Sequence, residues 1–158
     1  MPAERLPART FRDLLVWQKA HRFVLAVYQF TGNFPRRETF GLALQARRSA
    51  VSIAANITEG FARRSKPEKA RFLNIAEGSL EECRYYLIPA QDLGYGDTGE
   101  LMASADEVSR LLNAYTRTIL APDFLLLYPA GDIKGASPCL VRDCYGSITC
   151  TVWVRPNR

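Results

Sequence analysis

The stretch RRSAVSIAANITEGFARRSK, residues 47–66, sets two arginine pairs at either end of a run of small and polar side chains. Small side chains let a neighbouring helix approach closely, and here they are Ser49, Ala50, Ser52, Ala54 and Ala55. Val51, Ile53 and Ile57 supply apolar contacts along the same run. The pattern predicts an interior helix from about Thr39 to Phe61.

A second helix is predicted before this one, from Thr10 to about Thr31. Thr10 can cap its first turn, and Asp13 stands three residues later, as in a capping box. Apolar residues then recur at spacings of three and four. They form two stripes, which are Leu14, Trp17, His21, Val24 and Tyr28, and Val16, Ala20, Phe23, Val27 and Phe30.

Two further helices follow the opening stretch. Ser65 and Glu68 mark the start of the first, and Pro67 is tolerated there because first-turn amides lack helical partners. Pro89 is expected to interrupt its last turns and bend it. The two apolar seams are Leu73, Ala76, Leu80, Cys83, Leu87 and Ala90, and Leu101, Ala105, Val108, Leu112, Tyr115 and Ile119. Four amphipathic helices with short links predict an all-α fold, an antiparallel up-down four-helix bundle.

The predicted domain boundaries follow from these helices. Residues 1–9 form an N-terminal extension, residues 10–121 the bundle, and residues 122–158 a divergent tail. The tail holds four of the nine prolines and three of the four cysteines, and its helical periodicity is gone. Residues 139–143 and 144–154 could pair as a hairpin, but two strands alone are marginal in water. We expect the tail to be irregular or weakly β, and poorly ordered or packed on a neighbour.

Composition limits the class of protein. A chain of 158 residues with 47% hydrophobic residues is typical of one globular domain. No segment approaches the roughly 20 apolar residues that span a bilayer, so a membrane location is not expected. We expect a cytoplasmic protein. The cysteines have neither CxxC spacing nor histidine partners, which favours free thiols, and they are Cys83, Cys139, Cys144 and Cys150.

Charge is distributed unevenly along the chain. Residues 36–71 hold nine Lys/Arg against three acids, whereas residues 77–107 hold eight acids against Arg84 alone. Such asymmetry indicates an anionic partner for the basic part, or an acidic part of one subunit that meets the basic part of another. Both interpretations fit the sequence.

Catalytic chemistry has little support in the sequence. His21, the single histidine, lies on an apolar stripe and is interpreted as a packing residue. Glu77, Glu81 and Glu82 are interpreted as a solvated helix face. The Glu-x-x-His pairs of di-iron bundles, Gly-rich phosphate loops and zinc spacings are all missing from the sequence. We therefore expect no enzyme activity, no cofactor and no metal.

Four segments together resemble the family of four-helix bundle proteins encoded in intervening sequences of bacterial 23S rRNA genes. The segments are FRDLLVWQKA (11–20), FGLALQARRSAVSIAANITEGFARRS (40–65), FLNIAEGSLEE (72–82) and LGY (93–95). The family is similar to the accessory proteins of diversity-generating retroelements. The resemblance covers about residues 10–120. The family usually lacks a proline at the position of Pro89 and ends near Leu120, so the tail carries no inherited function.

The resemblance implies a homo-oligomer, most often a pentamer, with a basic surface thought to meet RNA or DNA. A reverse transcriptase or another protein is the further partner that it suggests. The family motif includes Ser52, Asn56 and Glu59, which would lie at or near helix contacts and need hydrogen-bond partners. We interpret them as a polar network that fixes helix register.

The arginine pairs allow two interpretations. They are solvated helix ends that pair with acids, or they contact phosphate with their forked guanidinium groups. Arg47 and Arg63 would lie about 24 Å apart along one helix, so they cannot form one tight site. The candidate contacts are Arg63, Arg64, Lys66 and Lys69, which are expected to be exposed at a helix junction, together with Arg47 and Arg48.

The leading hypothesis is a non-enzymatic homo-oligomer that binds nucleic acid as an accessory factor. No aromatic side chains interleave the cations, so backbone and shape contacts are favoured over stacked bases. The alternative is a protein-protein interaction scaffold whose charged regions serve oligomer or partner contact. Fold analogy alone does not decide between them.

Overall fold

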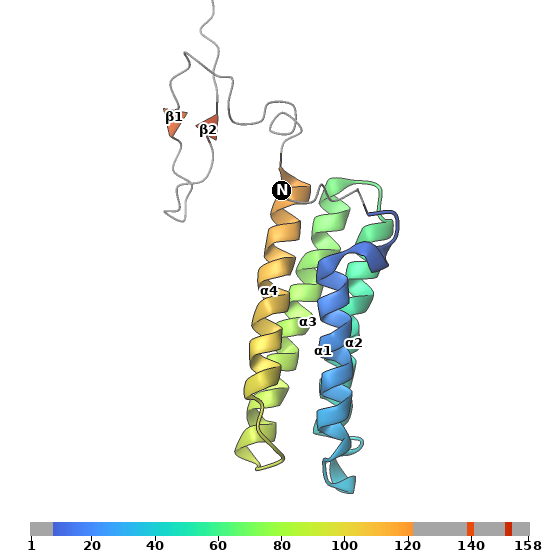
Figure 1. Cartoon of the computed structure of the whole chain (residues 1–158), viewed down its shortest axis with the longest axis vertical. Helices are drawn as coiled ribbons and strands as arrows, with labels where there is room; N and C mark the ends of the chain where they lie inside the picture. The colour runs from blue at the N-terminus through green and yellow to red at the C-terminus, as the bar shows by residue number, and fades with distance from the viewer. Residues whose placement is uncertain (1–7, 122–138, 141–150, 153–158) are drawn as a thin grey trace, which may run out of the picture. The chain divides into compact units, whose positions relative to one another are not determined.

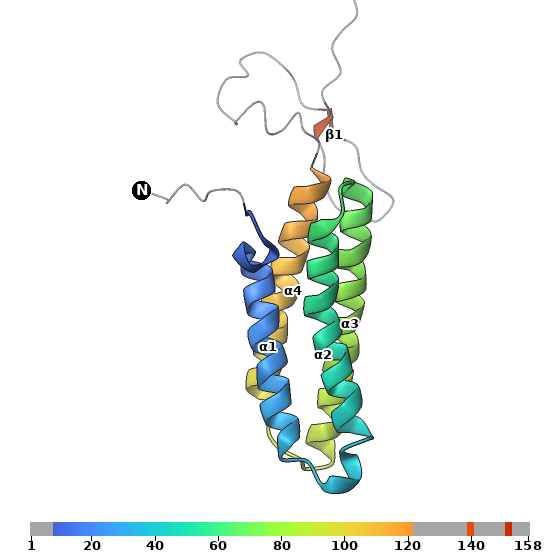
Figure 2. The ribbon, with the colours of Figure 1, turned by 90° about the vertical axis from the view of Figure 1, so that its right-hand side faces the viewer.

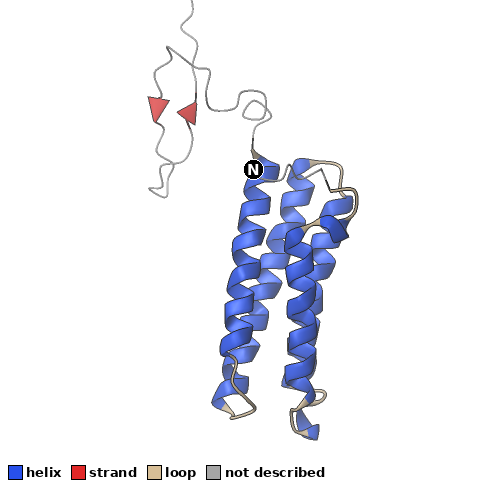
Figure 3. Ribbon diagram, in the orientation of Figure 1, coloured by secondary structure: helices blue, strands red, loops and turns tan. Residues whose placement is uncertain are grey.

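The computed structural model describes residues 8–121, 139–140 and 151–152. It divides the chain into two units, Met1–Ala121 and Pro122–Arg158. The first unit is an antiparallel bundle in which consecutive helices run in opposite directions (Figure 1, Figure 3). Its helices are α1 (Leu15–Gly32), α2 (Leu42–Ala62), α3 (Lys66–Asp92) and α4 (Gly99–Leu120), and its short 3-10 turns are η1 (Phe11–Asp13) and η2 (Arg36–Glu38). The predicted four-helix bundle is confirmed.

The second unit contains one small strand pair. Strand β1 (Cys139–Leu140) runs antiparallel to β2 (Thr151–Val152), with Cys139 opposite Val152. Both strands fall in the segments from which the sequence predicts a hairpin. Residues 1–7 of the N-terminal extension and the other residues of the tail lie outside the described residues. The expectation that the tail is poorly ordered or packed on a neighbour falls on these residues.

Each helix contributes one apolar face to a shared core. α2 packs most extensively against α3, and α1 packs against both α2 and α4. Gly60 permits the closest approach of α2 to α3, because a Cβ atom there would lie 3.2 Å from the Phe72 Cβ. The largest fully buried apolar side chains are Phe23, Val27, Ile53, Ile57, Leu73, Leu80, Leu87, Val108 and Leu112. In the bundle, no helix has both the length and the hydropathy needed to cross a membrane.

The predicted first helix is divided in the structure. Asp13 accepts hydrogen bonds from the backbone N–H groups of Arg9 and Thr10, at 2.9 and 2.8 Å. These contacts stabilise only η1, because Leu14 is extended at φ −74° and ψ 120° and ends the turn. α1 therefore begins at Leu15, and the prediction of one continuous helix from Thr10 was wrong.

The ends of α3 show one correct and one wrong prediction. Ser65 caps the first turn, since its Oγ accepts the Glu68 N–H at 3.4 Å. Pro89 does not interrupt the last turns, and α3 continues to Asp92. Its missing amide removes only one helical bond. Gly94 follows the end of the helix, and its φ of +74° allows a Schellman turn. The N–H groups of Gly94 and Tyr95 donate hydrogen bonds at 2.9 Å to the carbonyls of Gln91 and Ala90. The bend that the sequence predicts at Pro89 stays a prediction.

The buried thiol of Cys83 gives a testable consequence of this packing. Burial raises the pKa of the Cys83 thiol to about 11, and its Sγ contacts the Ala46 carbonyl oxygen at 3.7 Å. The thiolate is the reactive form, so native Cys83 should resist alkylation at pH 8 and react fully in denaturant. Peptide mass spectrometry after iodoacetamide treatment would measure the alkylated fraction of Cys83 separately from that of the other cysteines. Equal labelling in both conditions would contradict its placement in the core.

Candidate nucleic-acid interface

Antiparallel packing gathers positive charge at one end of the bundle. The end of α2, the start of α3, the end of α4 and η1 meet there (Figure 1). Within residues 8–121, this basic end holds eight Lys/Arg against three acids, Asp13, Glu59 and Glu68. The eight cations are Arg9, Arg12, Arg63, Arg64, Lys66, Lys69, Arg71 and Arg117.

Two of the predicted cations bind the carbonyl ends of helices. Lys69 Nζ donates a hydrogen bond to the Phe61 carbonyl oxygen at 2.8 Å, in the last turn of α2. Lys66 Nζ donates to the Ala121 carbonyl oxygen at 3.2 Å, just after α4. The last carbonyls of a helix have no helical partner and carry partial negative charge. Both lysines therefore help to hold this end of the bundle together.

The arginines of the same junction are more open. Arg63 stacks over the Phe72 ring at 4.5 Å, and its Nη2 lies 3.6 Å from a Glu59 carboxylate oxygen. Arg64 and Arg71 are exposed, and the described structure gives neither of them an ion pair or a hydrogen bond. Their guanidinium groups are available to a dissolved anion.

Arg47 and Arg48 lie apart from the basic end, in the first third of α2. Arg47 is half-buried, donates from Nε to the Thr31 hydroxyl at 2.8 Å, and lies over the Tyr28 ring at 5.1 Å. It joins α2 to α1. Arg48 is exposed. The structure therefore places the two arginine pairs of the opening stretch at different parts of the bundle.

The expected polar network is present for two of its three residues. Ser52 Oγ lies 2.9 Å from Ser79 Oγ of α3, and Asn56 Nδ2 donates to the carbonyl and the hydroxyl of Ser52 at 2.8 and 3.0 Å. Glu59 is exposed instead. It precedes Gly60, which faces α3, so the helical rotation of about 100° per residue turns its side chain outward.

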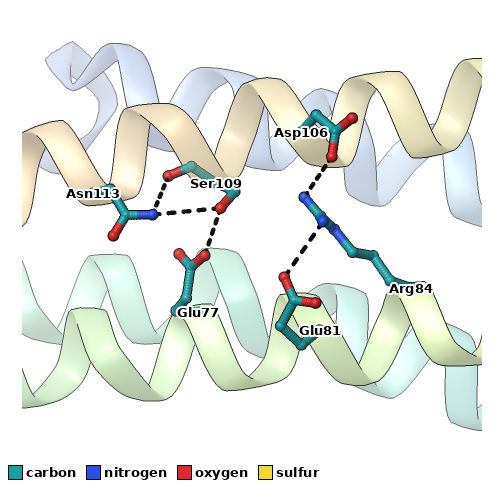
Figure 4. A network of polar contacts seen from close by, with 6 residues as sticks. All are labelled: Glu77, Glu81, Arg84, Asp106, Ser109 and Asn113. Carbon is teal, nitrogen blue, oxygen red and sulfur yellow. Dashed lines mark hydrogen bonds and ion pairs between the residues drawn. The ribbon is translucent and has the colours of Figure 1, made fainter. Parts of the chain in front are cut away.

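A second polar network, not predicted from the sequence, joins α3 to α4 (Figure 4). Ser109 Oγ donates to Glu77 Oε1 at 2.5 Å, while Glu77 Oε2 is buried without a hydrogen-bond partner. Arg84 bridges the Asp106 and Glu81 carboxylates, at 2.8 and 3.5 Å. The interpretation of Glu77 as solvated was therefore wrong. Glu81 and Glu82 are exposed, as expected. Glu77 and Glu81 each directly follow a seam residue, so this position in the sequence does not tell them apart.

An apolar groove follows α1 and α2 on the outside of the bundle. One hollow of about 390 Å³ and another of about 420 Å³ share Val51, which is 43% exposed although the sequence suggested helix contact. The apolar members of the groove are Phe11, Trp17, Val24, Tyr28, Leu44, Val51, Ala54 and Ala55.

His21 also lines this groove. Its ring stacks on Trp17 with centroids 5.0 Å apart, and no carboxylate pairs with it in the described bundle. The described residues contain no group of three His, Cys, Asp or Glu side chains placed to hold a metal ion.

Comparison with known proteins agrees with this arrangement. The model of the 23S rRNA-intervening sequence protein family matches residues 12–114. A crystal structure of a protein with unknown function from the S23 ribosomal protein family of Bacteroides thetaiotaomicron has 26% sequence identity and a TM-score of 0.57. That match covers 65% of this chain and 99% of the other. No curated protein matches the sequence.

Proposed function

Because the chain belongs to the 23S rRNA-intervening sequence protein family, we propose that it is a non-enzymatic homo-oligomer that binds RNA or DNA as a cytoplasmic accessory factor. In this proposal the basic end meets the phosphate backbone. The observation that carries it is the meeting of eight cations at one end of the bundle, where Arg64 and Arg71 are exposed and have no ion pair within residues 8–121. Such a surface attracts any polyanion and holds it by release of counterions.

Self-association is the second part of the proposal, with a pentamer as the expected state. The α1–α2 groove leaves apolar surface on one side of the bundle. α3 also exposes the apolar side chains of Ile75, Tyr85 and Ile88. Subunits that use different surfaces for their two neighbours make head-to-tail contacts, which close into a ring when the rotation between subunits permits.

The test is binding of purified protein to duplex DNA and to a structured RNA across a salt series. We expect affinity to fall steeply with salt, and Arg64→Gln with Arg71→Gln to reduce the slope of log K against log salt by about one per lost phosphate contact. Lys66 and Lys69 are left intact, because their replacement would also remove contacts to helix ends.

The matched control removes the same charge elsewhere. Arg22→Gln with Arg110→Gln changes two exposed arginines that are not among the candidate contacts and lie outside the basic end, and we expect it to leave the salt slope close to that of the wild type. Equal losses in both double variants would show that net charge alone drives binding. No binding by the wild type at physiological salt would overturn the proposal.

The alternative function is a protein-protein interaction scaffold, with a reverse transcriptase or another protein as partner. The specific observation in its favour is the α1–α2 groove, an apolar surface of the kind that marks interaction sites. Mass measurement during the same binding series separates the two functions. A scaffold would keep its oligomeric mass and show no salt-dependent affinity for nucleic acid.

A further inference from the structure

The turn between α1 and α2 carries an aromatic ring and two cations. It lies at the end of the bundle away from η1 (Figure 2). Phe40 is 85% exposed, the highest exposure of any large hydrophobic side chain in the described residues. Arg36 and Arg37 in η2 are exposed, and neither has an ion pair there. This cation-aromatic turn is separated from the basic end by the 21 residues of α2, roughly 30 Å.

The one acid of the turn does not neutralise these arginines. Glu38 Oε2 accepts the Leu42 N–H at 3.2 Å, and Glu38 Oε1 accepts the Tyr95 hydroxyl at 3.2 Å. The carboxylate is thereby held against α2 and the α3–α4 turn. Arg36 and Arg37 form no ion pair with it within the described residues. Asp92, Asp97 and Glu100 lie at the same end of the bundle, in or next to the α3–α4 turn.

Packing at this end also leaves Phe40 outside. The other rings associate with one another, Phe34 lying 5.2 Å from Phe30 and 5.0 Å from Tyr95 between ring centroids. Hydrogen bonds within the turn fix the backbone, including Gly41 N–H to the Glu38 carbonyl at 3.1 Å. Phe40 is therefore presented by an ordered turn, and no other ring of the described bundle stacks on it.

We propose that this turn is a second nucleic-acid contact, at which an unpaired base stacks on Phe40 while Arg36 and Arg37 contact the flanking phosphates. The inference rests on the proposed nucleic-acid binding and names the feature that is bound, a single-stranded segment. At this turn it replaces the sequence-based preference for backbone and shape contacts, because Phe40 is an exposed ring close in sequence to Arg36 and Arg37. Only an unpaired base exposes its flat face, because bases in a duplex are covered by their neighbours.

The size of the apolar surface favours a base over a protein partner. One aromatic side chain offers roughly 150–250 Å², whereas a stable protein interface covers roughly 800 Å² per partner. Arg36 and Arg37 precede Phe40 by four and three residues, so charged side chains share the turn with the ring. One exposed ring and two nearby cations match the base and the phosphates of a single strand.

The experiment compares a fully paired RNA duplex with a hairpin that has the same number of phosphates and an unpaired loop. Phe40→Leu keeps apolar bulk but removes the aromatic face. We expect it to weaken hairpin binding roughly 5- to 100-fold and to leave duplex binding unchanged. Arg36→Gln with Arg37→Gln should lower the salt slope for the hairpin by about two. The matched control is Leu93→Ala, an exposed apolar residue of the α3–α4 turn, which should bind both RNAs as the wild type does.

The outcomes separate this inference from the proposed function. If Phe40→Leu binds the hairpin as the wild type does, while Arg64→Gln with Arg71→Gln still weakens both RNAs, the inference is overturned and the basic end stands. If the wild type binds neither RNA, both proposals fail. If Phe40→Leu changes the oligomeric mass, Phe40 is covered by a second copy of the chain, which also overturns the inference.

Discussion

Phe23→Ala should lower the free energy of unfolding by about 3–5 kcal/mol. Phe23 is 0% exposed in the middle of α1 and belongs to the core that all four helices share. Removal of its ring takes apolar contacts away and leaves a cavity that rigid helices fill only in part. Since a domain of this size is stable by only about 5–15 kcal/mol, the loss is a large fraction of its total stability.

Urea denaturation followed by circular dichroism would measure the change. Leu25→Ala is the matched control, because Leu25 lies on the same helix two residues away but is 51% exposed. We expect a much smaller loss for Leu25→Ala, on the order of 1 kcal/mol or less. Similar losses for the two variants would mean that α1 does not bury the face described here.

Ser109→Ala should lower the free energy of unfolding by about 1–3 kcal/mol. The hydroxyl of Ser109 is the hydrogen-bond donor to Glu77 Oε1, and Glu77 Oε2 already lacks a partner (Figure 4). Its removal would leave a partly buried carboxylate without a hydrogen bond. The same urea titration gives the value. Thr118→Ala is the control, since that hydroxyl of α4 donates only to its own helix, and it should cost about 0.5 kcal/mol or less.

The loss of stability caused by Ser109→Ala should disappear when Glu77 is replaced as well. Glu77→Leu with Ser109→Ala removes the carboxylate together with its donor, and we expect a stability near that of the wild type. The double-mutant cycle should therefore show strong non-additivity, about 0.5–3 kcal/mol. A double variant that loses as much as the sum of the single variants would show that Glu77 does not depend on Ser109.

The helices could be predicted because their signals are local. Apolar residues at spacings of three and four mark the buried faces, and Ser65 with Glu68 marks the start of α3. The wrong predictions were also local ones. Thr10 carries a sound capping signal, yet the extended Leu14 divides the segment, and Pro89 lies inside a helix that continues past it.

The candidate site could be predicted only in part. The cluster expected at a helix junction lies at the junction between α2 and α3 and consists of Arg63, Arg64, Lys66 and Lys69. The sequence does not tell that Lys66 and Lys69 bind helix carbonyls while Arg64 and Arg71 stay open. Those roles depend on where the ends of neighbouring helices lie in space. The spacing of apolar residues along one helix does not encode that position.

The sequence by itself determined the number of helices, their order and most of their buried faces, because an apolar stripe is a property of one segment. Tertiary structure alone decided which charges meet. It brings Arg117, Arg9 and Arg12 to the same end of the bundle as the α2–α3 junction, sets Glu77 against Ser109, and leaves Phe40 exposed. The physical reason is that electrostatic and hydrogen-bond contacts depend on distances between helices, and antiparallel packing fixes those distances only when all four helices are in place.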